Sequence, residues 1–190
     1  PREKADSVGV PAMHVDARVV DDSGEEVEQG EVGELELASP HAADRYWANE
    51  SETRGTFGAT GDADHGWVST GDLVRVDEGG YYSIEGRKKN MYVSGGENVY
   101  PAEVENALTD NPEIDEAVVI PIPDETWGEV GKAVVVGDES LDLDELTEFL
   151  DGRLASFKHP KALAFVDEIP TSGPSKIDRS AVEERFGESN

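Results

Sequence analysis

The periodicity of the sequence changes at residues 86–90, and this change restricts the folds that the chain can adopt. Before it, short segments of alternating apolar and polar residues, clearest at 34–37, are separated by turn-forming residues, as is typical of strands with one buried face. After it, continuous apolar runs at 117–120 and 133–136 alternate with helical patterns, as expected of buried strands covered by helices. The sequence therefore predicts an α+β fold in two parts.

The first part, residues 1–86, is expected to be a strand-rich subdomain, either a distorted β-barrel or a sheet. Between its strands, Tyr46 and Trp47 are predicted to pack, and residues 55–66 are predicted to form a loop. The strands are predicted at 17–20, 34–37, 72–76 and 81–84, with a hairpin turn at 77–80.

The second part, residues 91–190, is expected to be a small α+β domain that follows a hinge at 87–90. Pro101 suits the first position of a helix, and leucines at helical spacing predict another helix over 143–154. A final helix is predicted from about Asp178. Strands are predicted at 91–93, 117–120, 133–136 and 162–166.

The charge of the chain excludes some classes of partner. Its 190 residues include 43 acidic and 16 basic side chains, for a formal net charge of −27. Such a charge disfavours binding to nucleic acids and to anionic membranes, because both need clustered cations. The acidic residues are spread over segments that look folded, as in proteins from salt-loving organisms, where ionic strength screens their repulsion.

Other features of the composition bear on the compartment. Cysteine is absent, which excludes disulfides, thiolate metal sites and a cysteine nucleophile and suits a cytoplasmic setting. No apolar run approaches the roughly 20 residues that span a bilayer, and no signal-peptide pattern is present. Because the sequence begins at Pro1, we expect it to be part of a longer product.

Several familiar site patterns fail. Residues 172–176 lack the spacing of a phosphate-binding P-loop, and Asp62 and Asp64 lack the other ligands of a calcium loop. No Ser-His-Asp arrangement can be argued from spacing. The four histidines lack metal-ligand spacing and are interpreted as surface residues; they are His14, His41, His65 and His159.

The residue types alone permit two different roles for Asp72 and for the basic residues 87–89. Asp72 lies between a glycine and a strand, so it could accept hydrogen bonds from ligand hydroxyls or from N–H groups of its own turn. Residues 87–89 are three consecutive cations, which suit an anionic ligand or merely neutralise an acidic surface. The adjacent Gly95 and Gly96 can adopt positive φ and leave room for a ligand or another backbone.

Three separated segments have the order and spacing of a known family. They are Ser-Thr-Gly-Asp at 69–72, the stretch 86–105 and the loop 170–179 with its lysine. Together with residues 9–11 and 30–35, they resemble the closing motifs of the adenylate-forming superfamily, which contains acyl-CoA synthetases, luciferases and peptide-synthetase adenylation domains. The resemblance covers nearly the whole chain but only about the last third of such an enzyme. The family's phosphate loop and acyl pocket match no part of it.

The resemblance implies a nucleotide-binding role for particular residues. Asp72 would hold the ribose hydroxyls of ATP, and Arg87 would contact the ribose and phosphate side. Lys176 would reach the α-phosphate and carboxylate oxygens and stabilise the charge that develops during adenylation. One departure from the family pattern lies beside it, because Ser175 stands where glycine is usual.

The resemblance also implies a small domain that rotates between two half-reactions. Lys89 would act as the hinge, and Gly95 and Gly96 would line the channel for the pantetheine arm of coenzyme A. Asn90 departs from the charged residue that is common there. ATP, a carboxylic acid and coenzyme A would be the substrates, with Mg²⁺ bound mainly by the N-terminal region of the same protein.

The function implied by the resemblance is an ATP-dependent carboxylic acid:CoA ligase of the fatty-acyl kind that yields acyl-CoA, AMP and pyrophosphate. The chain alone is expected to be inactive. One alternative is an adenylation domain that loads a carrier protein, and another is a non-catalytic acidic interaction module that retains the fold. The joint presence of Asp72, Arg87, Lys89 and Lys176 argues against the module.

Overall fold

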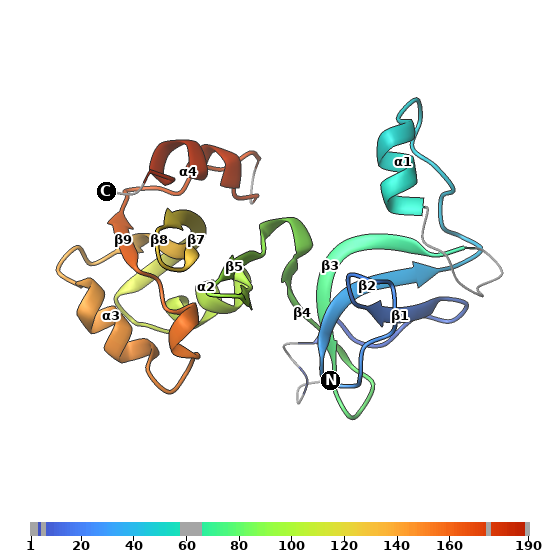
Figure 1. Ribbon diagram of the computed structural model, residues 1–190, viewed down its shortest axis with the longest axis horizontal. Coiled ribbons are helices and arrows are strands. Elements are labelled where there is room, and N and C mark those ends of the chain that lie inside the picture. Colours follow the sequence, from blue (N-terminus) through green and yellow to red (C-terminus); the bar gives the residue numbers. More distant parts are fainter. Residues whose placement is uncertain (1–3, 5–6, 58–65, 174–175, 189–190) are drawn as a thin grey trace. The chain divides into compact units, whose positions relative to one another are not determined.

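The computed structural model describes residues 4, 7–57, 66–173 and 176–188. The chain divides into two compact units, residues 1–89 and 90–190, each built around its own antiparallel-rich sheet (Figure 1). The predicted α+β, strand-rich fold class is confirmed. The hinge at 87–90 stays a prediction. No helix in the described residues is long and apolar enough to cross a membrane.

The first unit is a four-stranded antiparallel sheet with strand order β1-β2-β3-β4. The predicted turn joins β3 to β4, and the Asp77 carboxylate fixes it by accepting the N–H groups of Gly79 and Tyr81 at 2.8 and 3.0 Å. The predicted strands are therefore confirmed. They are β1 (Asp16–Val20), β2 (Val32–Ala38), β3 (Val68–Val76) and β4 (Tyr82–Arg87).

The region between β2 and β3 differs from expectation. A short helix, α1 (Glu50–Phe57), occupies part of the predicted loop, because Asn49 caps it through its carboxamide oxygen, which accepts the Glu52 N–H at 3.2 Å. Tyr46 does pack, edge-on against Phe57, with ring centroids 5.3 Å apart. The packing prediction for Trp47 is wrong, since this side chain is 96% exposed. Residues 58–65, which include the aspartates of the rejected calcium loop and His65, lie outside the described part.

The second unit is a five-stranded sheet with the order β6-β5-β8-β7, in which β9 pairs in parallel with β8. The sequence did not predict β6, which forms a hairpin with β5 across the Gly95-Gly96 turn. Both glycines have positive φ, 61° and 91°, which suits a tight two-residue hairpin. The strands are β5 (Tyr92–Ser94), β6 (Glu97–Val99), β7 (Ile114–Asp124), β8 (Gly128–Gly137) and β9 (Ala162–Phe165).

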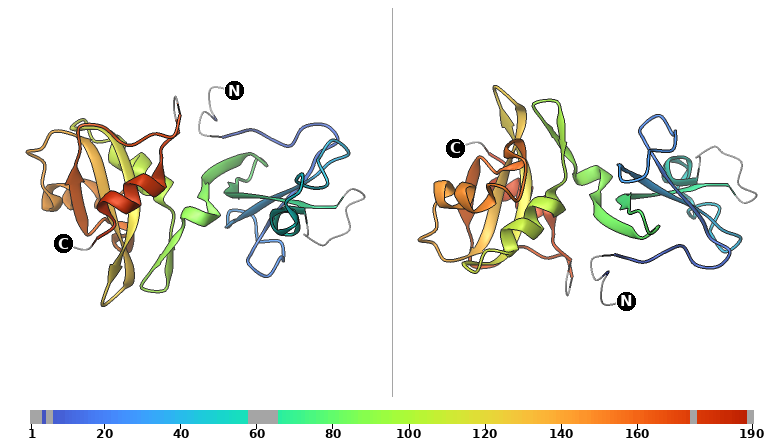
Figure 2. Two further views of the ribbon diagram at one scale, coloured as in Figure 1. Left: turned by 90° about the horizontal axis from the view of Figure 1, so that it is seen from above. Right: turned by 90° about the horizontal axis from the view of Figure 1, so that it is seen from below.

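Three helices cover the two faces of this sheet (Figures 1 and 2). Alternate residues of β7 and β8 point to opposite sides, so that Val119 packs with the helices α2 and α3 while Val118 packs with α4. All three predicted helices are confirmed. They are α2 (Pro101–Thr109), α3 (Leu143–Leu150) and α4 (Arg179–Phe186), and single 3₁₀ turns lie at Lys88–Asn90 and Ser156–Lys158.

Two details of this unit correct the sequence analysis. Helix α3 starts in a capping box between Asp142 and Glu145 but ends at Leu150, four residues before the predicted end at Leu154. The surface prediction is wrong for His159, which is 2% exposed. Its ring Nε2 lies 3.2 Å from the Leu154 carbonyl oxygen, and this partner makes the burial of a polar ring tolerable. His14 and His41 are exposed as predicted.

Candidate nucleotide-binding site

The candidate site in the first unit lies where β3 leaves its regular pairing with β2. Leu35 of β2 faces three residues of β3, Thr70 to Asp72, because Glu36 pairs with Ser69 while Glu34 already pairs with Leu73. Such a bulge bends the strand and redirects its side chains. It removes Thr70, Gly71 and Asp72 from the pairing with β2, while Asp72 pairs with Arg87 of β4.

Asp72 and Arg87 are paired across β3 and β4. The Arg87 Nη1 lies 2.5 Å from the Asp72 Oδ1 and donates a second hydrogen bond to the Thr70 carbonyl at 3.1 Å. The Arg87 side chain is 51% exposed and that of Asp72 is 28% exposed, so both are accessible from solvent. The structure therefore brings together the two residues that the sequence predicts at a nucleotide ribose.

The bulge is held open by side chain to backbone hydrogen bonds. The Thr70 hydroxyl donates to the Leu35 carbonyl at 2.8 Å and accepts the Asp72 N–H at 3.1 Å. Gly71 has a φ of +72°, a conformation that most side chains avoid. These contacts fix the backbone beside the Asp72 carboxylate.

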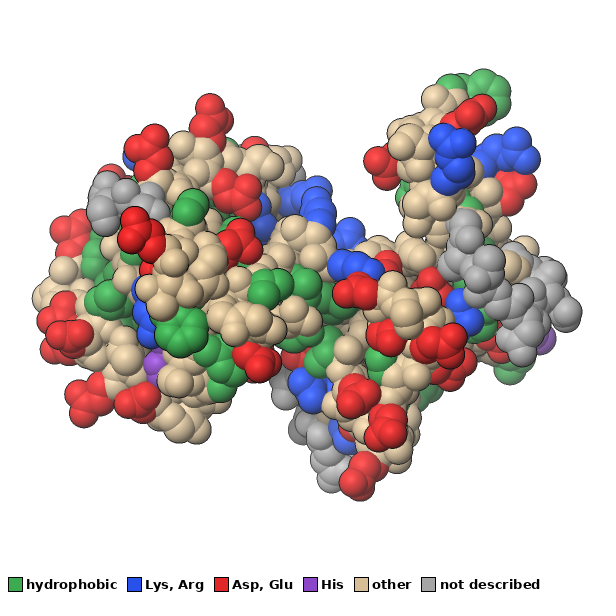
Figure 3. Space-filling model, viewed as in Figure 1, with side chains coloured by type: hydrophobic (Ala, Val, Ile, Leu, Met, Phe, Trp, Pro, Cys, Tyr) green, Lys and Arg blue, Asp and Glu red, His purple; other side chains and the backbone are tan. Residues whose placement is uncertain are grey.

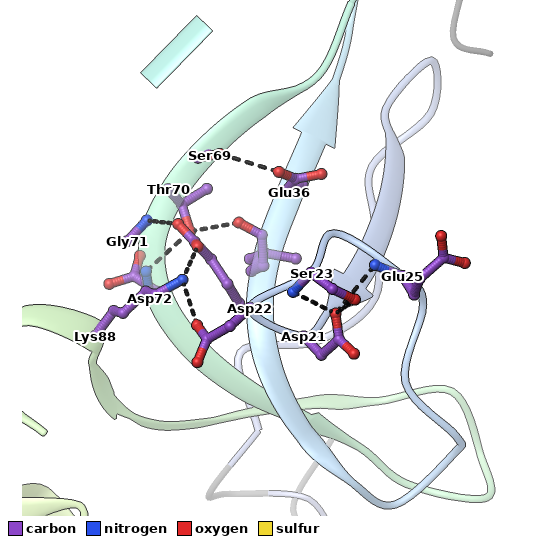
Figure 4. A network of polar contacts seen from close by, with 12 residues as sticks. Asp21, Asp22, Ser23, Glu25, Glu36, Ser69, Thr70, Gly71, Asp72 and Lys88 are labelled. Atoms are coloured by element: carbon purple, nitrogen blue, oxygen red, sulfur yellow. Dashed lines mark hydrogen bonds and ion pairs between the residues drawn. The ribbon is translucent and has the colours of Figure 1, made fainter. Parts of the chain in front are cut away.

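Glu34 of β2 contacts both the segment that carries Asp72 and the residue that follows Arg87. The sequence analysis did not predict a role for it. Its carboxylate accepts the Gly71 N–H at 3.2 Å and the Lys88 ammonium at 3.0 Å, so it bridges neighbours of Asp72 and Arg87. Lys88 also contacts Asp22 at 2.9 Å (Figure 4). Hydrogen bonding to Asp22 and Glu34 raises the pKa of Lys88. The Lys88 ammonium is therefore paired with carboxylates of the first unit, and the three cations at 87–89 are not equivalent candidates for binding an anionic ligand.

A second acidic residue of β2 supports the same segment. Glu36 is only 5% exposed, and its carboxylate accepts the Ser69 hydroxyl at 3.0 Å and pairs with Arg18 at 2.7 Å. Arg18 in turn lies over the Trp67 ring, 4.3 Å from its centroid. Alternation had marked the glutamates of 34–37 as the polar face of a strand. The pairing of Glu36 with Arg18 and Ser69 on neighbouring strands shows that this face is covered.

The other predicted site residues lie elsewhere. Lys89 is exposed and is the last residue of the first unit, whereas Gly95, Gly96 and Lys176 belong to the second unit. The Gly95 N–H donates to the Trp127 carbonyl at 2.9 Å. A side chain at Gly95 would meet the Trp127 ring, since an ideal Cβ there lies 2.8 Å from its Cζ3. Trp127 thus packs on the hairpin turn, although it is 49% exposed.

Lys176 lies in a closed loop between β9 and α4. Its carbonyl accepts the Ser172 N–H at 2.8 Å, the Asp178 N–H reaches the Pro170 carbonyl at 2.8 Å, and Thr171 pairs with Ile177. The lysine itself is exposed. Ser175, the departure from the family pattern, lies outside the described residues.

The described residues contain no group of three or more His, Cys, Asp or Glu side chains that could hold a metal ion. No step of the chemistry below passes through a metal bound by this chain. Acidic side chains are instead dispersed over the visible face of each unit (Figure 3). This dispersion matches the spread of charge along the sequence.

Comparison with known proteins finds similar sequences along nearly the whole chain. Residues 103–176 match the AMP-binding enzyme C-terminal domain. The chain is 43% identical over 187 residues to a feruloyl-CoA synthase of Amycolatopsis sp, covering 97% of this chain and 37% of that protein. It is 39% identical to the long-chain-fatty-acid–CoA ligase FadD13 of Mycobacterium tuberculosis, covering 96% and 35%. It is 41% identical to the fatty acid–[acyl-carrier-protein] ligase ScoC of Streptomyces coeruleorubidus, covering 95% and 34%.

Solved structures show the same relationship. The o-succinylbenzoate CoA synthetase MenE of Bacillus subtilis, in complex with its acyl-adenylate intermediate, superposes with a TM-score of 0.85 at 32% identity, covering 96% of this chain and 36% of that one. The chain thus spans just over a third of the length of the proteins it matches. Sequence and fold together show that the chain belongs to the family of adenylate-forming, AMP-binding enzymes of the acyl-CoA synthetase type and corresponds to their C-terminal part.

Proposed function

We propose that this chain is the C-terminal part of an ATP-dependent carboxylic acid:CoA ligase that works through an acyl-adenylate. The observation that carries the proposal is the Asp72–Arg87 pair, fixed on a bulged strand and accessible from solvent. We further propose fatty acids as the acid class. FadD13 supports this choice, but the named acids of the relatives differ, and the acid would be selected by a region outside this chain.

In the first half-reaction, a carboxylate oxygen of the acid attacks the α-phosphorus of ATP. The new acyl–oxygen–phosphorus bond forms as the bond to the β-phosphate breaks, and pyrophosphate leaves. Asp72 would accept the ribose hydroxyls in charge-assisted hydrogen bonds, and Arg87 would contact the ribose and phosphate side. Lys176 would stabilise the negative charge that develops on the α-phosphate oxygens. Loss of one such donor costs roughly 3–4 kcal/mol of transition-state stabilisation.

In the second half-reaction, the sulfur of coenzyme A attacks the acyl carbonyl carbon. A thioester forms, AMP leaves with the bonding electron pair, and the thiol proton passes to solvent. Lys176 would have no part in this step, since the small domain would rotate about Lys89 and move it away. The Gly95-Gly96 turn would then border the path of the pantetheine arm. Mg²⁺ would accompany ATP and be bound mainly by the N-terminal region of the same protein.

One observation supports a second candidate function. The identity to ScoC, named as a fatty acid–[acyl-carrier-protein] ligase, is 41%, between the 43% to the feruloyl-CoA synthase and the 39% to FadD13. The same adenylation half could therefore deliver its acyl group to a carrier protein. Both acceptors present a pantetheine thiol, so Asp72, Arg87 and Lys176 would keep their roles.

The setting of the enzyme is also part of the proposal. A net charge of −27 without a single cysteine suits a cytoplasm of high ionic strength, where salt screens the repulsion between carboxylates. We therefore propose a cytoplasmic enzyme of a salt-loving organism.

The proposal is tested by separating the two half-reactions in the full-length gene product. Lys176→Ala should slow acid-dependent pyrophosphate release by about 100- to 1,000-fold and leave thioester formation from added acyl-adenylate unchanged. Lys161→Ala removes the same charge from another exposed lysine of the unit and should leave pyrophosphate release intact. Equal loss in both halves, or no loss in the first, would contradict the assigned role.

A further inference from the structure

An ion pair in the second unit joins three elements at the edge of its sheet. The Arg179 Nη2 lies 2.6 and 2.7 Å from the two carboxylate oxygens of Glu105, so one guanidinium nitrogen makes charge-assisted contacts with both oxygens. The Glu105 side chain is 14% exposed and that of Arg179 is 22% exposed. Glu105 belongs to α2 and Arg179 is the first residue of α4.

The pair also completes the backbone hydrogen bonding of β7, which is the last strand of its sheet path. The Glu105 carboxylate accepts the Val119 N–H at 2.8 Å, and the Arg179 Nη1 donates to the Val119 carbonyl at 3.0 Å. Val119 is fully buried, so these two backbone groups would lack partners without the pair. The ion pair therefore takes the place of a neighbouring strand and fixes α4 to α2 around the sheet edge.

Arg179 stands three residues after Lys176, and the chain between them has little freedom. The Ile177 backbone pairs with Thr171, the Asp178 N–H is bonded to the Pro170 carbonyl, and the Asp178 side chain caps α4 by accepting the Ala181 N–H at 3.1 Å. The chain that closes the Lys176 loop therefore leads directly into Arg179, the residue that is paired with Glu105.

We propose that Glu105 and Arg179 are positioning residues for Lys176: they anchor its loop so that the ammonium group reaches the reacting phosphate. The inference rests on the proposed function, because it assumes that Lys176 acts in adenylation. A displacement of about 1 Å at a reacting group can cost about 100-fold in rate, so a loosened anchor should be visible in the adenylation half. It should not be visible in thioester formation, where Lys176 has no part.

The same helix supplies a matched control. Glu103 also pairs through both carboxylate oxygens, at 2.7 Å, with the ammonium of Lys158, and its side chain is partly buried, at 29% exposed against 14% for Glu105. Lys158 lies on the single 3₁₀ turn before β9 and not next to the Lys176 loop. Glu103→Gln therefore weakens a comparable ion pair of α2 without touching the anchor.

The experiment uses the full-length gene product with Glu105→Gln, Arg179→Lys and Glu103→Gln, and Lys176→Ala as reference. Glu105→Gln and Arg179→Lys should lower the rate of acid-dependent pyrophosphate release by about 10- to 100-fold, with thioester formation from added acyl-adenylate unchanged. Glu103→Gln should leave pyrophosphate release unchanged. The inference is overturned if the Glu105 and Arg179 variants slow both halves equally, slow neither, or behave as Glu103→Gln does.

A second measurement, amide hydrogen exchange, tests the anchor even if a variant folds poorly. The Lys176→Ala reference separates a failure of the proposed function from a failure of the positioning role. In Glu105→Gln, amide hydrogen exchange at Ser172 and Asp178 should accelerate at least tenfold relative to the unmodified protein, whereas Glu103→Gln should leave both rates alone; unchanged exchange overturns the anchor. If Lys176→Ala does not slow pyrophosphate release selectively, the proposed function itself fails. If it does while the anchor variants do not, only the positioning role fails.

Discussion

Arg87 and Asp72 face each other across two antiparallel strands, with the guanidinium Nη1 2.5 Å from the carboxylate Oδ1. The contact lies beside a bulge of β3 that is braced by Thr70 and Glu34. In the proposed ligase this pair would contact the ribose, and bracing of this kind would reduce the entropy that the site loses when a nucleotide binds.

This site leads to the first prediction. In the full-length gene product, Asp72→Asn should lower kcat/KM for ATP by about 10- to 150-fold, because hydrogen bonds to a charged group contribute about 1.5–3 kcal/mol. Steady-state kinetics with ATP as the varied substrate checks this. Asp77→Asn, in the turn after β3, is the control and should keep the ATP dependence. Identical kinetics for the two variants would remove Asp72 from the nucleotide site.

The second prediction concerns the turn between β5 and β6. Gly95→Ala should destabilise the 190-residue chain in urea unfolding for two reasons: about 1–2 kcal/mol comes from its positive φ, and further cost comes from the clash with the Trp127 ring. In a Trp127→Ala background, only the first cost should remain.

Gly96→Ala is the matched control for this cycle. Its φ is +91°, but nothing lies within 4 Å of an added Cβ. Its cost should therefore be the same in both backgrounds. Equal costs for Gly95→Ala with and without the Trp127 ring would show that the ring does not rest on the turn.

The third prediction concerns Tyr92, whose side chain is 3% exposed and whose hydroxyl has no hydrogen-bond partner in the described part of the chain. Tyr92→Phe should therefore leave stability at pH 7 unchanged or raise it by up to about 1 kcal/mol. A loss of more than this in chemical unfolding would show that the hydroxyl is bonded.

The same residue also predicts a pH dependence. Burial raises the pKa of Tyr92 in the folded state, whereas an unfolded tyrosine ionises near about pH 10. The folded state therefore holds the proton more tightly, and stability is fully present below about pH 10 and lost as the pH rises above it. Tyr92→Phe should lose less stability than the parent between about pH 9.5 and 11. Tyr81→Phe, which alters a half-exposed ring, should follow the parent.

The fourth prediction concerns salt. With a net charge of −27, repulsion between carboxylates should destabilise the chain at low ionic strength more than its exposed ion pairs stabilise it. The thermal midpoint should rise by several degrees between about 0.1 M and 2 M NaCl. Chloride is preferred because sulfate strengthens burial by exclusion from any protein surface. A midpoint that falls or stays level would contradict the high-salt setting.

The sequence was most informative where local pattern and tertiary burial agree. The apolar runs at 117–120 and 133–136 could be read as strands because both faces of that sheet are covered, by α2 and α3 on one side and α4 on the other. Pro101 and Asp178 marked helix starts because capping is a local property.

Prediction failed where distant partners decide the outcome. The sequence pattern predicts that Glu36 faces solvent, but in the fold it is paired with Arg18 and Ser69 of neighbouring strands. His159 is predicted at the surface, but its ring is buried next to the Leu154 carbonyl. Glu105 carries no site prediction in the sequence analysis. Its partner Arg179 is 74 residues away, and no local pattern connects them.

The proposed ligase function can be tested by the products that the full-length gene product makes from ATP, coenzyme A and a series of carboxylic acids. We expect acyl-CoA, AMP and pyrophosphate in equal amounts with at least one acid, fatty acids being the first choice, and no AMP from the 190-residue chain alone. AMP formation by the chain alone would contradict the need for the N-terminal region. Absence of acyl-CoA with every acid, while a carrier protein is acylated, would contradict coenzyme A as the acceptor.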